Sequence, residues 1–375
     1  MADQLERDVI LLNAPNSPRR QLNGAMTPDN VDGGSDYIER NALVLVALIN
    51  QLKPRLASAS EKFAIIGPSM GGLISRYALA YMEKRQYALT SAGLPPDPRW
   101  DHNTTLWVSL DAPHQGANVP IGAQEFLRYF QNFDATAEDK FNTRLNTPAA
   151  MQMLVHHHSA GANSVLGAPG YRDRFMLALR DNGRPGSLGY PELLRRVAIT
   201  NGRLDGNGQE AGAPCGTALQ MDKVNKYLRF TILRPLFFYR RANRGTVAIG
   251  DINFSPSNGN CDVFKGQVSG DVKLFVWKGP VRRTSTTNST TGSYDLAPGG
   301  WYNTQQQIVD GGGDGTSYKN VVPNHCFIPT VSALGYQYQT MSGYRNTSSL
   351  PNAYAPLLGL SCNNETPFDA YHGAS

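Results

Sequence analysis

Residues 63–79 read FAIIGPSMGGLISRYAL, and the order of residue types in this stretch decides the fold. Phe63–Ile66 is a short apolar run typical of a buried strand, and apolar residues then recur at helical spacing over residues 74–81. The pattern Gly-x-Ser-x-Gly, centred on Ser69, stands directly between the two. That pattern is weak by itself, but between an apolar strand and an amphipathic helix it predicts a sharp turn that presents a nucleophilic serine.

The residues around Ser69 fit the geometry that such a turn needs. A strained turn excludes bulky neighbours, and Gly67 and Gly71 carry no side chains. Gly72 permits the helix and the sheet to approach closely. The backbone N–H of Met70, at the start of the helix, is expected to point to the place where a tetrahedral oxyanion forms. Ser69 is therefore the candidate nucleophile and Met70 the candidate oxyanion-hole residue, and the alternative is an ordinary glycine-rich turn.

Other apolar runs place this turn in a larger α/β pattern. Val9–Leu12, Leu106–Leu110 and Arg196–Thr200 each read as a short buried strand. A helix is expected over residues 36–52, where apolar residues recur every three or four positions. Strands that alternate with helices in this way predict a mostly parallel sheet covered on both faces. The three runs and Phe63–Ile66 are expected to lie parallel in that sheet.

Two long insertions are expected within the core. One is mostly helical and polar and is placed to form a cap over the active site, whereas the other has short β-like segments among Gly, Asn, Ser and Thr. Phe126, Leu127 and Phe130 in the helical insertion either line an acyl channel or form the packing face of a surface helix. The expected division is 1–117 for the first part of the core, 118–190 for the helical cap, 191–205 for a core strand, 206–320 for the β-rich insertion and 321–375 for the C-terminal core segment.

Three segments together resemble the α/β-hydrolase superfamily: IIGPSMGGLISRYAL (65–79), SLDAPHQGA (109–117) and FIPTVSAL (327–334). Within it, the chain is most similar to lipase-like bacterial serine esterases, which are often secreted. The resemblance implies hydrolysis of small-molecule or lipid esters through an acyl-enzyme on Ser69. It also implies a histidine base and an acid, with no cofactor. No metal site is expected, because the residues lack the spacing of a zinc or calcium site. The family has strands before Val9 and a base loop after the last strand, so the resemblance implies a chain truncated at both ends.

The base that Ser69 needs has more than one candidate. A histidine oriented by a carboxylate is the usual partner of a catalytic serine. His372 lies in the C-terminal stretch where the base loop is expected, and His325 precedes the FIPTVSAL segment. A third alternative places the base beyond Ser375. His114 matches a position that is usually structural in similar lipases.

Two aspartates compete for the role of the acid. Asp205 follows the predicted strand Arg196–Thr200, at the position where the acid usually lies. Asp295 precedes a tight Pro-Gly-Gly turn and could reach the site from the β-rich insertion. The sequence leaves both open.

Composition limits the remaining possibilities. The formal net charge is +5 and there is no dense basic stripe with interleaved aromatics, so nucleic-acid binding is set aside. No apolar run approaches the roughly 20 residues of a membrane-spanning helix. The 4 cysteines are scattered without Cys-x-x-Cys spacing, which argues against zinc and leaves disulfides or buried thiols open. Residues 1–8 are polar and hold no signal peptide, while several Asn-x-Ser/Thr triplets favour a secreted protein.

Two further functions remain compatible with these residues. A catalytically impaired, hydrolase-like binding protein would keep the fold without a working base. An acyltransferase would use the same serine and pass the acyl group to an alcohol instead of water.

Overall fold

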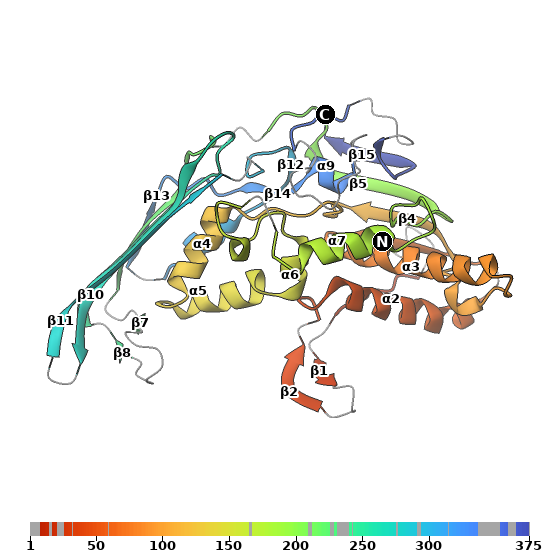
Figure 1. Cartoon of the computed structure of the whole chain (residues 1–375), viewed down its shortest axis with the longest axis horizontal. Coiled ribbons are helices and arrows are strands. Elements are labelled where there is room, and N and C mark those ends of the chain that lie inside the picture. Colours follow the sequence, from red (N-terminus) through yellow and green to blue (C-terminus); the bar gives the residue numbers. More distant parts are fainter. Residues whose placement is uncertain are drawn as a thin grey trace.

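A four-stranded parallel sheet carries the turn at Ser69 (Figure 1). Its strands are β3 (Phe63–Pro68), β4 (Thr104–Leu110), β5 (Arg195–Arg203) and β15 (Ala370–Ala374), in the order β15-β5-β4-β3. Each neighbouring pair is parallel. Three of the four strands predicted from the sequence are therefore confirmed, and the chain belongs to the α/β class.

The computed structural model describes residues 8–14, 17–20, 26–31, 33–58, 60–164, 167–208, 212–225, 229–230, 240–241, 243–274, 277–290, 294–313, 315–336, 353–358 and 365–374.

The predicted strand at Val9–Leu12 is wrong. These residues form no strand, and their side chains are between 45% and 89% exposed. They are followed by a hairpin of β1 (Ser17–Arg20) and β2 (Met26–Val31), which projects below the helices in Figure 1. An apolar run indicates a tendency to be buried but does not specify a partner strand. In the part of the chain that the structure describes, β3 pairs with β4 on one side and with no strand on the other.

Two helices lie against the sheet on the side of β3. The predicted helix is α2 (Ile38–Leu52), and the helix that follows Ser69 is α3 (Met70–Ser91). The apolar face of α2 packs on α3, whose other side covers β3 and the buried Trp107 of β4. This packing holds the first turn of α3 rigidly at the carboxyl edge of the sheet.

The segment after β4 is mostly helical. It contains α4 (Ile121–Phe130), α5 (Ala135–Lys140), α6 (Pro148–Met153) and α7 (Arg172–Asp181), with a π-helical turn at Phe141–Leu145. Side-chain oxygens at the N-caps fix two of these short helices. The Asp134 carboxylate accepts from the N–H groups of Thr136 and Ala137, and the Thr147 hydroxyl accepts from that of Ala150.

A five-stranded antiparallel sheet forms most of the segment that follows β5. Its order is β11-β10-β9-β6-β13, and its long strands extend to the left in Figure 1. A disulfide between Cys215 and Cys261 joins the chain just before β6 to the start of β10. Cys326 is fully buried, and Cys362 lies outside the described residues. The strands are β6 (Thr217–Asn225), β9 (Asn243–Asn253), β10 (Cys261–Leu274), β11 (Trp277–Ser289) and β13 (Thr316–Lys319).

Smaller elements complete the fold. A two-stranded sheet of β12 (Gly299–Tyr302) and β14 (His325–Pro329) lies beside β5, and two helices, α8 (Thr304–Asp310) and α9 (Thr330–Ala333), follow these strands. A short ladder joins β7 (Arg229–Phe230) to β8 (Arg240–Arg241). None of the helices in the described ranges is both long and apolar enough to cross a membrane.

Candidate active site at Ser69

Ser69 occupies a strained backbone position between β3 and α3. Its φ is 50° and its ψ is −125°, a combination that residues with a Cβ atom rarely adopt. The neighbouring strand fixes this geometry, because the Ser69 N–H donates to the Leu110 carbonyl at 2.8 Å. The Ser69 carbonyl accepts from the Gly72 N–H at 2.9 Å. The residue is exposed, so its hydroxyl stands at the surface on the carboxyl edge of the sheet.

The glycines beside Ser69 are sterically required. A Cβ atom at Gly67 would lie 2.5 Å from the Gly71 carbonyl oxygen and from the Ser75 hydroxyl. A Cβ atom at Gly72 would clash with the Cβ of Ala112, where helix and sheet meet. The turn thus places a non-glycine residue at the strained position and glycines at the crowded ones.

The backbone N–H of Met70 lies at the N-terminus of α3. The first N–H groups of a helix have no partner within the helix, and Ser69 provides no side-chain cap. They lie at the positive end of the dipole of a 22-residue helix. This position suits a donor to an oxyanion formed at Ser69.

His325 is fully buried, and both of its ring nitrogens already have partners. Nδ1 lies 2.9 Å from the Cys326 carbonyl oxygen, which can only accept, so Nδ1 carries the proton. Nε2 then accepts from the Thr304 hydroxyl at 2.8 Å. Burial lowers the pKa of His325 to about 4. The structure therefore does not bring this imidazole to Ser69.

His372 lies on β15, at the far side of the parallel sheet from β3. It is in register with Ile199 of β5, which is in register with Leu110 of β4, which is in register with Pro68. Three interstrand steps of about 4.8 Å separate His372 from the residue before Ser69, about 14 Å in all. One hydrogen bond between a histidine and a serine side chain does not span that distance. The His372 side chain is exposed.

No histidine bonds to the Ser69 hydroxyl among the described residues. His114, nearest along the chain to the end of β4, is fully buried, and its Nε2 lies 2.7 Å from the Ser109 hydroxyl. Burial, with a smaller contribution from Arg76, lowers its pKa well below the usual value. His114 thus remains neutral inside the fold.

Neither candidate acid lies against a histidine. Asp205 forms an ion pair with Arg203 and accepts from Asn207, and the hydrogen bond from Arg203 holds the pKa of this carboxyl far below its usual range. Asp295 is buried and accepts from the Ser255 N–H at 2.7 Å and the Asn118 amide at 2.9 Å. Burial raises the pKa of Asp295. The described residues therefore do not assemble a complete serine–histidine–acid triad.

Asp111 is a polar residue at this edge that sequence reasoning missed. It directly follows β4, has a positive φ of 45° and is largely buried beside Gly300 of β12. Its carboxylate accepts from the Asn201 N–H and side-chain amide, both at 3.1 Å, while burial raises its pKa. Its position directly after a core strand is the sequence signal that places it at the same edge of the sheet as Ser69.

Within the described ranges, no group of three or more His, Cys, Asp or Glu residues is arranged to hold a metal ion. Comparisons with known proteins add no assignment, since no family model, curated protein or solved structure matches this chain.

Proposed function

We propose that this chain has an α/β-hydrolase fold and cleaves carboxylic esters through an acyl-enzyme on Ser69. The observation that carries the proposal is the backbone of Ser69. A non-glycine residue at φ 50° and ψ −125° costs of order 1–3 kcal/mol, and such strain persists where the surrounding structure imposes it, often at functional sites. The strain presents one hydroxyl at the carboxyl edge of a parallel sheet, at the N-terminus of a long helix.

The chemistry follows from this geometry. The Ser69 oxygen attacks the acyl carbon, its proton passes to a base, and the carbonyl oxygen becomes an oxyanion that accepts from the Met70 N–H. The C–O bond to the alcohol then breaks, and the alcohol leaves with a proton. Water attacks the resulting acyl-enzyme, releases the carboxylic acid and restores the serine hydroxyl.

The base determines how fast this sequence runs. A serine hydroxyl is a weak nucleophile without a neighbouring base, and in the described residues no imidazole bonds to it. Oxyanion stabilisation and binding alone still leave roughly 10³–10⁴-fold acceleration over water when a triad member is removed. We therefore expect residues 1–375 to hydrolyse an activated ester slowly, and faster as the pH rises.

A fluorophosphonate probe tests the proposal directly, because it labels a reactive serine covalently. We expect one adduct on Ser69, together with slow hydrolysis of p-nitrophenyl acetate, and loss of both in Ser69→Ala. Ser91→Ala is the matched control, since Ser91 is also exposed and ends the same helix. An acyl product formed with an added alcohol would identify transfer instead of hydrolysis.

The missing imidazole contact favours one second candidate, a hydrolase-like binding protein. In that case the turn at Ser69 would bind an ester or carboxylate without cleaving it. Wild type would then show no adduct and no turnover. Wild type and Ser69→Ala would bind that ester or carboxylate with equal affinity.

A further inference from the structure

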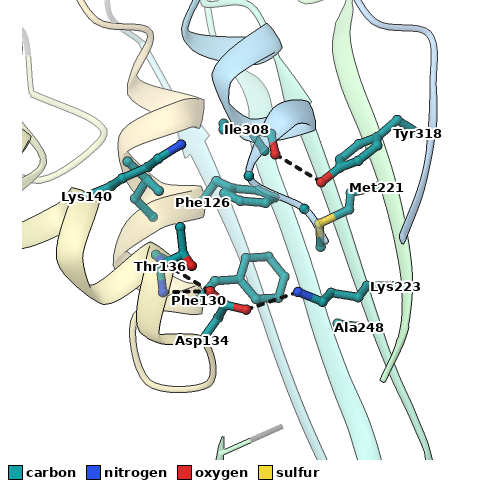
Figure 2. Close-up of a pocket in the computed structure, with 14 residues that line it drawn as sticks. Phe126, Phe130, Asp134, Thr136, Lys140, Met221, Lys223, Ala248, Ile308 and Tyr318 are labelled. Carbon is teal, nitrogen blue, oxygen red and sulfur yellow. Dashed lines mark hydrogen bonds and ion pairs between the residues drawn. The ribbon is translucent and has the colours of Figure 1, made fainter. Parts of the chain in front are cut away.

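A small pocket lies between the helical segment and the antiparallel sheet (Figure 2). Its volume is about 50 Å³. The residues that line it come from α4, α5, β6, β9, β13 and the chain around α8, and none comes from β3, β4 or the turn at Ser69. The pocket is therefore separate from the candidate active site.

The inner wall of the pocket is apolar and firmly packed. The rings of Phe126 and Phe130 lie 4.6 Å apart and are each 4% exposed. They rest on β9 at Gly250, where a Cβ atom would lie 2.6 Å from the Phe126 ring. Met221 and Ala248 complete this wall from the sheet. Phe126, Leu127 and Phe130 were predicted to form either an acyl channel or a packing face. They pack in a buried core and also line this pocket.

Charged groups lie among the lining residues, and positive charge exceeds negative charge there. Lys223 pairs with Asp134 at 3.0 Å, and Figure 2 shows this contact beside the Phe130 ring. The Asp134 carboxylate also caps α5, so it is already fully engaged. Lys140 donates to the Gln307 carbonyl oxygen at 2.8 Å, a partner with no formal charge. The lining groups therefore carry one ammonium more than they carry carboxylates.

The other ionisable groups nearby do not remove this excess. Tyr318 donates to the Ile308 carbonyl oxygen at 3.0 Å, and burial raises its pKa to about 12, so it stays neutral. Asp310 is exposed, accepts from Gln306 and does not line the pocket. Solvent screens an exposed carboxylate more than it screens charges at the pocket wall.

We propose that this pocket binds the apolar tail of a short aliphatic carboxylate and places its carboxylate beside Lys140. A volume of about 50 Å³ holds roughly four water-sized groups, which matches a chain of about four carbons better than a long acyl chain. Apolar walls with a few convergent polar groups are typical of small-molecule sites. The proposal does not depend on ester hydrolysis at Ser69.

Pentanoate is the probe, and the methyl group of Met221 is the reporter in a ¹³C-methyl NMR titration. For a ligand of this size we expect saturation with a Kd of about 1 mM. The methyl group of Met82, which lies on α3 and is buried in the core cluster that contains Trp107, serves as the internal reference and should not shift. Neutral 1-pentanol should bind about fivefold more weakly than pentanoate, and pentylammonium should not saturate.

Variants separate the pocket from nonspecific effects. Lys140→Gln should weaken pentanoate binding about fivefold, whereas Lys84→Gln, which removes another lysine bonded to a backbone carbonyl, should leave it unchanged. Ala248→Leu should fill the pocket and abolish saturation. Using Ser69→Ala as the background keeps the result independent of any hydrolysis. An unmoved Met221 signal, equal binding of 1-pentanol, or unchanged binding in Lys140→Gln would overturn the proposal.

Discussion

The strain at Ser69 predicts that glycine is more stabilising than alanine at this position. Both Ser69→Gly and Ser69→Ala remove the hydroxyl, so they differ only in the backbone conformations that they favour. Alanine retains a Cβ atom at φ 50°, which costs about 1–3 kcal/mol, and glycine adopts this region freely. Glycine loses about 0.5–1 kcal/mol more chain entropy on folding. The net expectation is that Ser69→Gly is more stable than Ser69→Ala by about 1 kcal/mol.

Ala88→Gly is the control for this comparison. Ala88 is exposed within the same helix, so exchanging alanine for glycine there should destabilise the protein by about 1 kcal/mol. The assay is urea unfolding followed by circular dichroism for wild type and all three variants. The sign of the alanine-to-glycine difference should reverse between positions 69 and 88. If glycine is the less stable residue at both positions, the backbone at Ser69 does not store the strain inferred from its φ of 50°.

Three further predictions concern packing, pH and the disulfide. Gly72→Ala should destabilise the protein by about 1–3 kcal/mol, because the added methyl group would clash with Ala112 where α3 meets β4. It should also lower the labelling of Ser69. The urea midpoint measures the first effect and the adduct yield measures the second. The pKa of His325 falls from the ordinary 6.5 to about 4 in the folded protein. The contribution of neutral His325 to the free energy of unfolding, up to about 3 kcal/mol, is therefore complete above pH 6.5 and is lost as the pH falls toward 4. Unfolding measured at several pH values should therefore show a shallower acid slope in His325→Asn, and an unchanged slope would contradict the assigned burial. Reducing Cys215–Cys261, which are 46 residues apart, should cost about 4 kcal/mol, and equal urea midpoints with and without reductant would contradict that value.

The local features of the fold were predictable because their signals are local. A strand, a glycine-rich turn and a helix follow one another within residues 63–79, and the structure has β3, Ser69 and α3 in that order. The prediction of a strand at Val9–Leu12 was wrong because apolar character does not specify a partner strand. These residues remain exposed outside the sheet. The pairing of Cys215 with Cys261 depends on how the long antiparallel strands align, which residue spacing does not determine.

The candidate site was predictable only in part, for a similar reason. The backbone at Ser69 is set by its immediate neighbours, which the sequence shows directly. A histidine partner depends instead on where distant segments pass, and the structure places His325 in a buried pair with Thr304 and His372 three strands away from β3. Asp111 was missed because its hydrogen bonds come from Asn201 and its burial depends on β12, and both lie far away in the sequence.

Intact-protein mass spectrometry after incubation with a fluorophosphonate tests most directly whether Ser69 is a nucleophile. We expect a single adduct that maps to Ser69, is absent from Ser69→Ala and persists in Ser91→Ala. Because no imidazole bonds to the hydroxyl in the described residues, the labelling rate should rise steadily from pH 5 to 9 without a histidine inflection near pH 6.5. Absence of any adduct, or equal labelling of wild type and Ser69→Ala, would contradict the claim that Ser69 is a hydrolase nucleophile.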